Sequence, residues 1–482
     1  MKMDRRRFIA ASTGIFAGAA ASSKFVRQIF ARQTEKRPNI LLINTDDQPA
    51  WWVGAYGNRD IYTPNMDRLA SEGMLFRTAV TCPVCSPSRA MLLTGRYNHQ
   101  VGIDDFINND EDTGLPNGSI TFAQVLHNAG YKTGIVGKWH LGKEQQYWPT
   151  VRGFDYWAGF TNAHGPKDPP VIVKHGDKKP ETIEHKGFTT NILTDYAINF
   201  IRDNRSESFA LYLSYPAPHM GYLPVPDEDM AHYKGKKFHF PDYKKFPQVN
   251  ITEQQLHRKY IANYAPVTSI DRNMGQLFAE LKALGLEENT VVIFTGDNGY
   301  CLGRHGLESK GNARYLGTNI PRPNMFDDSI VVPLIVRWPG VVKPGSVCNR
   351  LVSHLDFFPT MMELAGLNPA SIPHLEGISM LPLLRGKEKI WRNELFLIYD
   401  MKYHAVAHMR LIRTRRWKLI HHYENEALNE LYDLQKDPGE LENIYGESEV
   451  SSVQRMLTRQ LKAWEERVGA TKEDLLKRRR HY

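Results

Sequence analysis

Continuous apolar runs recur along this 482-residue chain and constrain the fold that it can adopt. A strand with water on one face alternates apolar and polar side chains, so a continuous apolar run indicates a strand buried on both faces, as in a parallel sheet. Residues 122–129, 193–201 and 270–284 show helical patterns between the runs. Alternating strands and helices predict a doubly wound α/β fold, with a large, mostly parallel sheet flanked by helices. The predicted strands are residues 40–43, 133–136, 209–213, 291–294 and 333–336.

Polar or titratable side chains follow four of these runs. In open α/β sheets, ligands bind beyond the carboxyl ends of the strands, so side chains distant in sequence can meet there. A single strand followed by polar residues would indicate only exposure to solvent. Four such strands, each followed by titratable residues next to glycine or proline, predict a shared site. The residues are Asp46, Asp47, Lys138, His140, His219, Asp297 and Asn298.

The ends of two predicted strands carry hard oxygen donors, namely Asp46, Asp47, Asp297 and Asn298. Carboxylate pairs brought together repel each other unless a cation binds between them. An all-oxygen ligand set favours Ca²⁺ or Mg²⁺ over zinc. An isolated Asp-Asp pair would indicate a turn or a helix cap. The Asp-Asn pair after a matching strand favours the metal site.

The sequence pattern changes beyond about residue 390. Short strand-like segments separated by turns precede a helical pattern over residues 450–468. This order predicts a smaller antiparallel sheet with a helix. We expect a catalytic α/β domain over residues 36–388 and a smaller C-terminal α+β subdomain over residues 389–482. The strand-like segments are residues 394–399, 408–413, 417–421 and 430–434.

The first 31 residues have the features of an export signal. Residues 5–8, Arg-Arg-Arg-Phe, resemble the core of a twin-arginine signal; an apolar run over residues 9–21 follows, and its last alanines offer a cleavage site. An ordinary Sec signal is the alternative. No later segment reaches the ~18 apolar residues that a membrane helix needs. We therefore expect a periplasmic or secreted bacterial protein without a stable membrane anchor.

The formal charge of +8 does not indicate a nucleic-acid-binding protein. Residues 1–31 hold six Lys or Arg and one acidic residue, so the remainder carries 55 basic and 52 acidic residues. Local positive charge at a site could still attract an acidic substrate.

The four cysteines are too few for a disulfide framework in an exported chain. Cys82 and Cys85 form a C-x-x-C pair, but the second pair that a structural zinc site needs is missing, and the surroundings do not resemble a thioredoxin unit. The sequence leaves open whether Cys82 pairs with another cysteine. Cys85 also opens the run C-S-P-S-R, in which the proline restricts the backbone and Arg89 offers a planar fork of donors to an anionic oxygen.

Residues 83–95 resemble the signature of type I sulfatases, members of the alkaline phosphatase-like superfamily in which the cysteine of C-x-P-x-R is oxidised to formylglycine (3-oxoalanine). Through its motifs, the resemblance spans roughly residues 36–386, and it extends weakly into the C-terminal part at residues 430–434 and 437–438. Phe-Asp-Asp-Ser at residues 326–329 departs from the family's usual Y-E-x-S, and the loop before it is long. Further segments that resemble the family are G-K-W-H-L-G at 137–142, A-P-H at 217–219 and H-G-x-x-x-K at 305–310.

The resemblance implies a role for each candidate catalytic residue. Cys85, as formylglycine, would be the nucleophile and would bind Ca²⁺ together with the four oxygen donors named above. His140 would take a proton from the second hydroxyl of the nucleophile, and His219 would protonate the leaving alcohol. The cations that would neutralise the sulfate are Arg89, Lys138 and Lys310. Candidate sugar contacts are His99, Arg304 and His305.

The sequence therefore predicts a sulfuric ester hydrolase with one Ca²⁺ per chain, acting on a sulfated carbohydrate. Its expected partners are a formylglycine-generating or anaerobic sulfatase-maturating enzyme and the export machinery. One alternative is a phosphoester or phosphonate hydrolase of the same superfamily, which can share the metal ligands. Another is a catalytically silent protein that binds sulfated glycans, which an unmodified Cys85 would favour.

Overall fold

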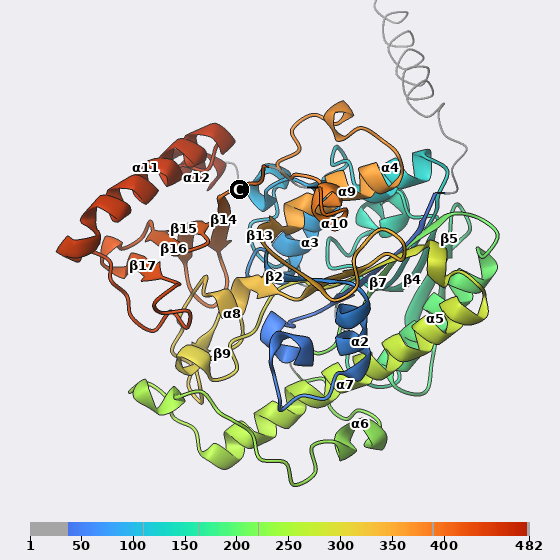
Figure 1. The fold of residues 1–482 in the computed structure, drawn as a ribbon, viewed down its shortest axis with the longest axis horizontal. Helices are drawn as coiled ribbons and strands as arrows, with labels where there is room; N and C mark the ends of the chain where they lie inside the picture. Colours follow the sequence, from blue (N-terminus) through green and yellow to red (C-terminus); the bar gives the residue numbers. More distant parts are fainter. Residues whose placement is uncertain (1–36, 109, 163, 220, 388–389, 480–482) are drawn as a thin grey trace, which may run out of the picture.

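The fold consists of a large central sheet between two layers of helices and a smaller C-terminal sheet (Figure 1). The computed structural model describes residues 37–108, 110–162, 164–219, 221–387 and 390–479. The predicted export signal lies outside the described residues. Within them, eleven strands form the large sheet and four form the C-terminal sheet, which confirms the predicted fold class. Across the same residues, no helix combines the length and the apolarity that crossing a membrane requires.

Four parallel strands form the centre of the large sheet, in the order β8, β1, β7 and β3. Each contains one of the predicted apolar runs, and every residue of β8, β1 and β7 is buried. Burial on both faces is the reason that these runs do not alternate with polar residues. The four strands span Thr290–Gly296, Asn39–Thr45, Phe209–Ser214 and Lys132–Lys138.

The two faces of this sheet carry separate hydrophobic cores. Successive side chains of β1 alternate between them: Ile40 and Leu42 enter one core, whereas Leu41 and Ile43 enter the other. The first face carries α3 (Cys85–Thr94), α4 (Phe122–Asn128) and α9 (Phe357–Leu364). The second carries α2 (Pro64–Glu72), α5 (Thr189–Asp203) and α7 (Glu253–Ala283) (Figure 1).

Further strands extend the sheet at both edges. β12 (Leu334–Arg337), which begins one residue into the fifth predicted run, lies antiparallel between β8 and β2 (Met74–Val80). β11 (Val331–Val332) and β13 (Ser346–Ser353) also pair with β2. At the other edge, the sheet continues from β3 through β4 (Tyr156–Phe160), β5 (Val171–His175) and β6 (Glu181–Ile183).

The C-terminal sheet is antiparallel throughout and packs under one helix, α11 (Ser451–Val468). Trp464 of α11 also reaches the large sheet's side of the molecule, where its indole N–H donates to the Tyr97 hydroxyl at 3.2 Å. Val84, which directly precedes α3, and Met91, which lies within it, enter the same core as α11. The four strands are β14 (Glu394–Met401), β15 (Ala407–Thr414), β16 (Trp417–His422) and β17 (Glu430–Asp433).

Candidate functional site

The ends of the central strands bring the predicted polar residues into one buried cluster. Asp46 and Asp47 follow β1, and Asp297 and Asn298 follow the neighbouring strand β8. The backbone N–H of Asp47 donates to Asp297 Oδ1 at 3.0 Å, and Asn298 Nδ2 donates to Asp47 Oδ1 at 2.8 Å. The Asp46-Asp47 and Asp297-Asn298 pairs predicted from sequence are therefore in direct contact. We call the following set the strand-end cluster: Asp46, Asp47, Cys85, Arg89, Lys138, His140, His219, Asp297, Asn298 and Lys310.

Cys85 is the first residue of α3 and is only 2% exposed. Its Sγ lies within 4.8 Å of carboxylate oxygens of Asp46 and Asp297. Lys310 Nζ donates to this Sγ at 2.9 Å and also contacts the Asp47 carboxylate. The N-terminus of a helix carries partial positive charge, so an anionic group at residue 85 would be favoured there.

Arg89 connects α3 to three of the strand ends. Its Nη2 and Nε donate to Asp297 Oδ2 at 2.7 and 3.0 Å. Its Nη1 donates to Ser214 Oγ at 2.6 Å and to the carbonyl of Lys138 at 3.1 Å. Lys138 in turn directs its ammonium group to the Asp46 carboxylate. Both cations are 1% exposed, so their charges act with little screening by water.

The two histidines of the cluster differ in exposure. His140 is buried, and its Nε2 lies 3.1 Å from the carbonyl oxygen of Ile107. Because that oxygen can only accept, Nε2 carries the proton; Nδ1 has no hydrogen-bond partner among the described residues. The His219 side chain is 36% exposed, with Nε2 3.8 Å from Asp47 Oδ2. His219 is therefore open to a ligand from solvent.

Burial and neighbouring charges set the protonation of the cluster. Burial raises the pKa of the Cys85 thiol to about 11, although Lys138 and Lys310 oppose this. Burial and the charge of Asp46 raise the pKa of Asp297. Burial alone would raise the pKa of Asp46 as well, but the surrounding cations, Lys138 first among them, hold it well below its usual value. Burial, Lys138 and Arg89 lower the pKa of His140, so its ring is neutral at neutral pH.

The acidic part of the cluster fits a hard cation. Asp46 Oδ1 and Asn298 Oδ1 are buried and accept no hydrogen bond from any described residue. A buried oxygen without a donor is costly, and a metal ion would satisfy both. Asp47 and Asp297 complete a set of oxygen ligands suited to Ca²⁺ or Mg²⁺.

The structure also assigns neighbours that the sequence did not single out. Ser88, within C-S-P-S-R, donates to the carbonyl of Asp297, and its Oγ lies 3.1 Å from His354 Nδ1. Thr81 Oγ1 lies 2.6 Å from Ser88 Oγ and 3.0 Å from the same histidine nitrogen. This buried group ties α3 to the end of β8. His354 is 266 residues from Ser88, so no local sequence pattern could have indicated it.

The three candidate sugar contacts lie outside the strand-end cluster. His99 Nε2 is 2.9 Å from the carbonyl oxygen of Val468, at the end of α11. Arg304 and His305 both pair with Asp328, at 3.1 and 3.3 Å. Their role in sugar binding stays a prediction. All four cysteines belong to the described residues; each is buried, and none forms a disulfide there.

Comparisons with known proteins agree with this geometry. The sulfatase family model matches residues 38–367, and the model of the C-terminal part of N-sulphoglucosamine sulphohydrolase matches residues 321–467. N-acetylglucosamine-6-O-sulfatase of Bacteroides thetaiotaomicron is 29% identical, over 88% of this chain and 86% of the relative. N-acetylgalactosamine-6-sulfatase of Rattus norvegicus is 33% identical, over 74% of this chain and 67% of the relative.

A solved structure extends the likeness to the whole fold. It contains a protein in complex with its substrate, D-glucosamine-2-N,6-O-disulfate, and is 27% identical to this chain. The TM-score is 0.78, and the match covers 91% of this chain and 99% of the other. The family match spans more than half of the chain and includes every residue of the strand-end cluster. The chain therefore belongs to the sulfatase family and is a sulfatase, an enzyme that hydrolyses sulfate esters.

Proposed function

We propose that this sulfatase removes sulfate from a sulfated carbohydrate, using a formylglycine formed from Cys85 and a Ca²⁺ ion. The observation that carries the proposal is the position of Cys85, at a helix N-terminus within 4.8 Å of two carboxylates and 2.9 Å from Lys310. The substrate class is supported by relatives that are named for sulfated glucosamine and galactosamine. The ligands proposed for Ca²⁺ are Asp46, Asp47, residue 85, Asp297 and Asn298.

Formylglycine and Ca²⁺ would together supply an activated oxygen nucleophile that the unmodified chain lacks. With a pKa of about 11, the Cys85 thiol is protonated at neutral pH and is a weak nucleophile. Burial and the carboxylates of Asp46 and Asp297 raise that pKa, but Lys138 and Lys310 oppose them and would favour a negatively charged group at residue 85. Arg89, Lys138 and Lys310 place three cations around it, and the helix N-terminus adds to their field.

The remaining residues divide into groups that hold the sulfate and groups that move protons. Lys138 and Lys310 would bind sulfate oxygens. Arg89 would keep its own positive charge in position through its two hydrogen bonds to Asp297. His140 would accept a proton at Nδ1, the ring nitrogen without a partner among the described residues. His219, on the exposed side of the cluster, would give a proton to the leaving alcohol.

Replacement of Cys85 by alanine tests this proposal. We expect Cys85→Ala to lower turnover of 4-nitrophenyl sulfate by about 10³-fold or more, because the side chain that becomes the nucleophile is absent. Peptide mass spectrometry of the wild-type protein should show residue 85 with an aldehyde oxygen in place of the thiol.

Cys82→Ala is the matched control. Cys82 is also a buried thiol, three residues away, but it donates to the carbonyl of Ile398 and lies outside the cluster. This variant should retain turnover. Activity in Cys85→Ala, an unmodified thiol in a fully active protein, or faster turnover of 4-nitrophenyl phosphate than of the sulfate would contradict the proposal.

We further infer export through the leader at residues 1–31 and maturation of Cys85 by a dedicated oxidising enzyme. Export is supported by the arginine-rich start and the apolar run of the leader. The division into a catalytic domain over residues 36–388 and a subdomain over residues 389–482 is supported by the separate sheet that begins with β14.

A further inference from the structure

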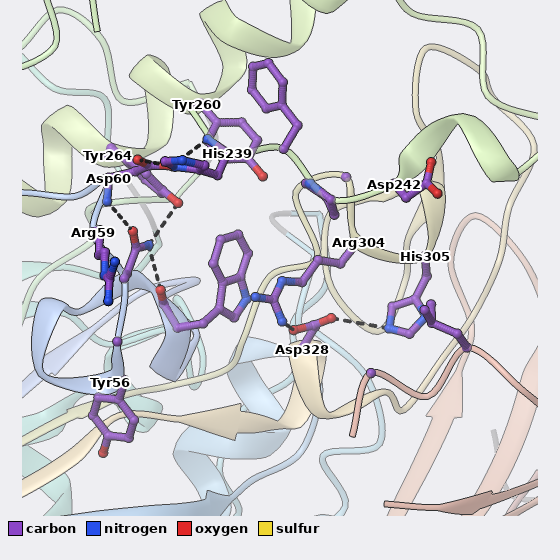
Figure 2. Close-up of a pocket in the computed structure, with 18 of the residues that line it drawn as sticks. Tyr56, Arg59, Asp60, His239, Asp242, Tyr260, Tyr264, Arg304, His305 and Asp328 are labelled. Carbon is purple, nitrogen blue, oxygen red and sulfur yellow. Dashed lines mark hydrogen bonds and ion pairs between the residues drawn. The ribbon is translucent and has the colours of Figure 1, made fainter. Parts of the chain in front are cut away.

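A cavity of about 600 Å³ is lined by aromatic and charged side chains (Figure 2). Among the described residues, its lining includes no member of the strand-end cluster. Two of its walls come from segments that also carry cluster residues. Trp51 follows Asp47 by four positions, and η8 (Arg304–Gly306) lies between Asn298 and Lys310. A third wall is the loop at residues 239–246. Cavities of this size hold small organic ligands.

Aromatic side chains form much of the wall. Phe240 and Tyr260 meet edge to face, with ring centroids 4.9 Å apart. The guanidinium of Arg304 lies 4.3 Å from the centre of the Trp51 ring. Aromatic rings with an apolar face and a few polar neighbours suit a ligand that also has both kinds of surface, such as a sugar ring.

Most charges in the cavity are already paired within the protein. Asp328 accepts from Arg304 and lies 3.3 Å from His305, as Figure 2 shows. Asp60 accepts from the backbone N–H of His239 at 2.7 Å and lies 3.0 Å from the ring of the same histidine. These acids are occupied, so the cavity is not an acidic site despite its carboxylates.

Two cations in the cavity wall remain available. Arg59 is exposed, and no described residue forms a hydrogen bond or an ion pair with it. Lys245 lies 3.0 Å from Asp242, but the two side chains are 67% and 60% exposed. Water screens such a pair, so the ammonium group can also bind a ligand anion.

We propose that this cavity is a second glycan-binding site. It would hold one sulfated sugar unit of a glycan while the sulfate ester on another unit of the same glycan is hydrolysed at residue 85. The proposal rests on the proposed function, because it takes the substrate to be an oligosaccharide or polymer. The aromatic wall would contact the sugar ring, and Arg59 and Lys245 would each offer a cation to a sulfate group. The site would add affinity for a long chain by engaging a second unit of it.

Calorimetric titration of the inactive Cys85→Ala protein tests this site. The probes are octasaccharides of heparan sulfate and chondroitin sulfate, each beside its desulfated form. We expect a sulfated octasaccharide to bind and Arg59→Ala/Lys245→Ala, in the same background, to weaken its binding about 10-fold, because two exposed charge contacts are lost. Both side chains are exposed, so the melting temperature should not change.

Lys237→Ala/Lys244→Ala is the matched control, since it also removes two exposed positive charges from the same loop region but from outside the cavity lining. Its affinity for the sulfated octasaccharide should stay within about twofold of that of the Cys85→Ala protein. Equal affinities of the two double variants, equal binding of the desulfated chains, or no binding of any sulfated probe would overturn the proposal. Turnover of 4-nitrophenyl sulfate, which carries no second sugar unit, tests the proposed function separately.

Discussion

A single hydrogen bond at His140 decides which of its ring nitrogens can accept a proton. The carbonyl oxygen of Ile107 fixes the proton on Nε2, and Nδ1 is left as a buried acceptor without a partner among the described residues. Burial, together with Lys138 and Arg89, lowers the pKa of this ring. A neutral imidazole with one free lone pair is the form that a general base requires.

His140→Ala should therefore lower kcat for 4-nitrophenyl sulfate by about 10²- to 10⁴-fold, the usual contribution of a general acid or base. KM should change far less, because the sulfate would be held by cations that this substitution leaves in place. Steady-state kinetics measures both. His127→Ala, which removes a half-exposed histidine paired with Asp155, is the control, and an equal loss there would argue against a specific role for His140.

At the scale of the elements, the strand-end cluster depends on a close approach between β3 and β7. Gly137 has φ 104°, and a Cβ at this position would lie 2.0 Å from the carbonyl oxygen of Ser214. Glycine therefore allows Ser214 Oγ to donate to the carbonyl of Lys138 at 2.8 Å. The same hydroxyl accepts from Arg89. The backbone at residue 137 thus helps to position two cations.

Gly137→Ala is expected to lower the free energy of unfolding by more than about 2 kcal/mol, through left-handed strain and a backbone clash together. Gly130→Ala is the control, because Gly130 has φ 90° but no atom within 4 Å of the added Cβ. Gly130→Ala should lower the free energy of unfolding by about 1 kcal/mol, through the left-handed strain alone. Urea denaturation measures both values. Equal losses in the two variants would show that the contact with Ser214 relaxes at no cost.

The C-terminal sheet contains a buried carboxylate that makes its stability depend on pH. Glu430 of β17 lies 2.9 Å from His422 and 3.2 Å from Arg322, and it accepts from the Tyr432 hydroxyl at 2.5 Å. Burial would raise the pKa of Glu430, but Arg322 and the other two partners outweigh it and lower the pKa to about 2. Because the folded pKa lies below the unfolded value of about 4.3, the carboxylate stabilises the fold above that pH.

Glu430→Gln should therefore lower the free energy of unfolding at pH 7 by up to about 3 kcal/mol, and the difference from wild type should shrink as the pH falls from about 4.3 towards 2. Urea denaturation at pH 7 and near pH 3 measures this. Glu280→Gln, at a surface pair with Arg202, should change stability by less than about 1 kcal/mol. A difference at Glu430 that stayed constant with pH would contradict this account.

Among the strands of the large sheet, the sequence predicted the central four, whose burial is nearly uniform, and missed β2, whose burial is mixed. The four central strands are buried on both faces, so their apolar runs are continuous. β2 was missed, since exposed Arg77 interrupts its pattern. The pattern at residues 270–284 indicated only the second half of α7, which begins at Glu253 and contains Pro266, a residue that commonly ends helices.

The strand-end residues could be predicted to meet because neighbouring parallel strands end at the same edge of a sheet. Contacts between distant segments gave no such signal. Neither the pairing of Ser88 with His354 nor the cavity at Arg59 and Lys245 follows from any local pattern. The roles assigned to the cluster residues stay predictions until they are tested.

At the scale of the whole molecule, the proposed Ca²⁺ would join the two strands at the centre of the sheet. Four of its five proposed ligands follow β1 and β8, which pair over seven residues between both hydrophobic cores. Burial, and then repulsion from Asp46, raise the pKa of Asp297. A bound ion would relieve this repulsion and would stabilise the folded state as a whole.

Dialysis against a chelator should therefore lower both the melting temperature and the turnover of 4-nitrophenyl sulfate, and Ca²⁺ should restore them. At a concentration of Ca²⁺ 100 times its Kd, the expected stabilisation is about 2.7 kcal/mol. Thermal denaturation with and without the ion measures it. In Asn298→Ala, which lacks one ligand oxygen, most of the Ca²⁺-dependent shift should disappear; a full shift there would place the ion elsewhere.

The burial of α3 determines when the proposed oxidation of Cys85 could take place. All ten residues of the helix are buried, and Cys85 is 2% exposed. A second enzyme that oxidises this side chain needs the segment in its own active site, which the folded chain does not permit. If Cys85 is oxidised as proposed, oxidation would have to precede folding, and the two processes would compete for each newly made chain. The active fraction of a preparation would therefore report how slowly the chain folds, as well as how much oxidising enzyme the cell contains.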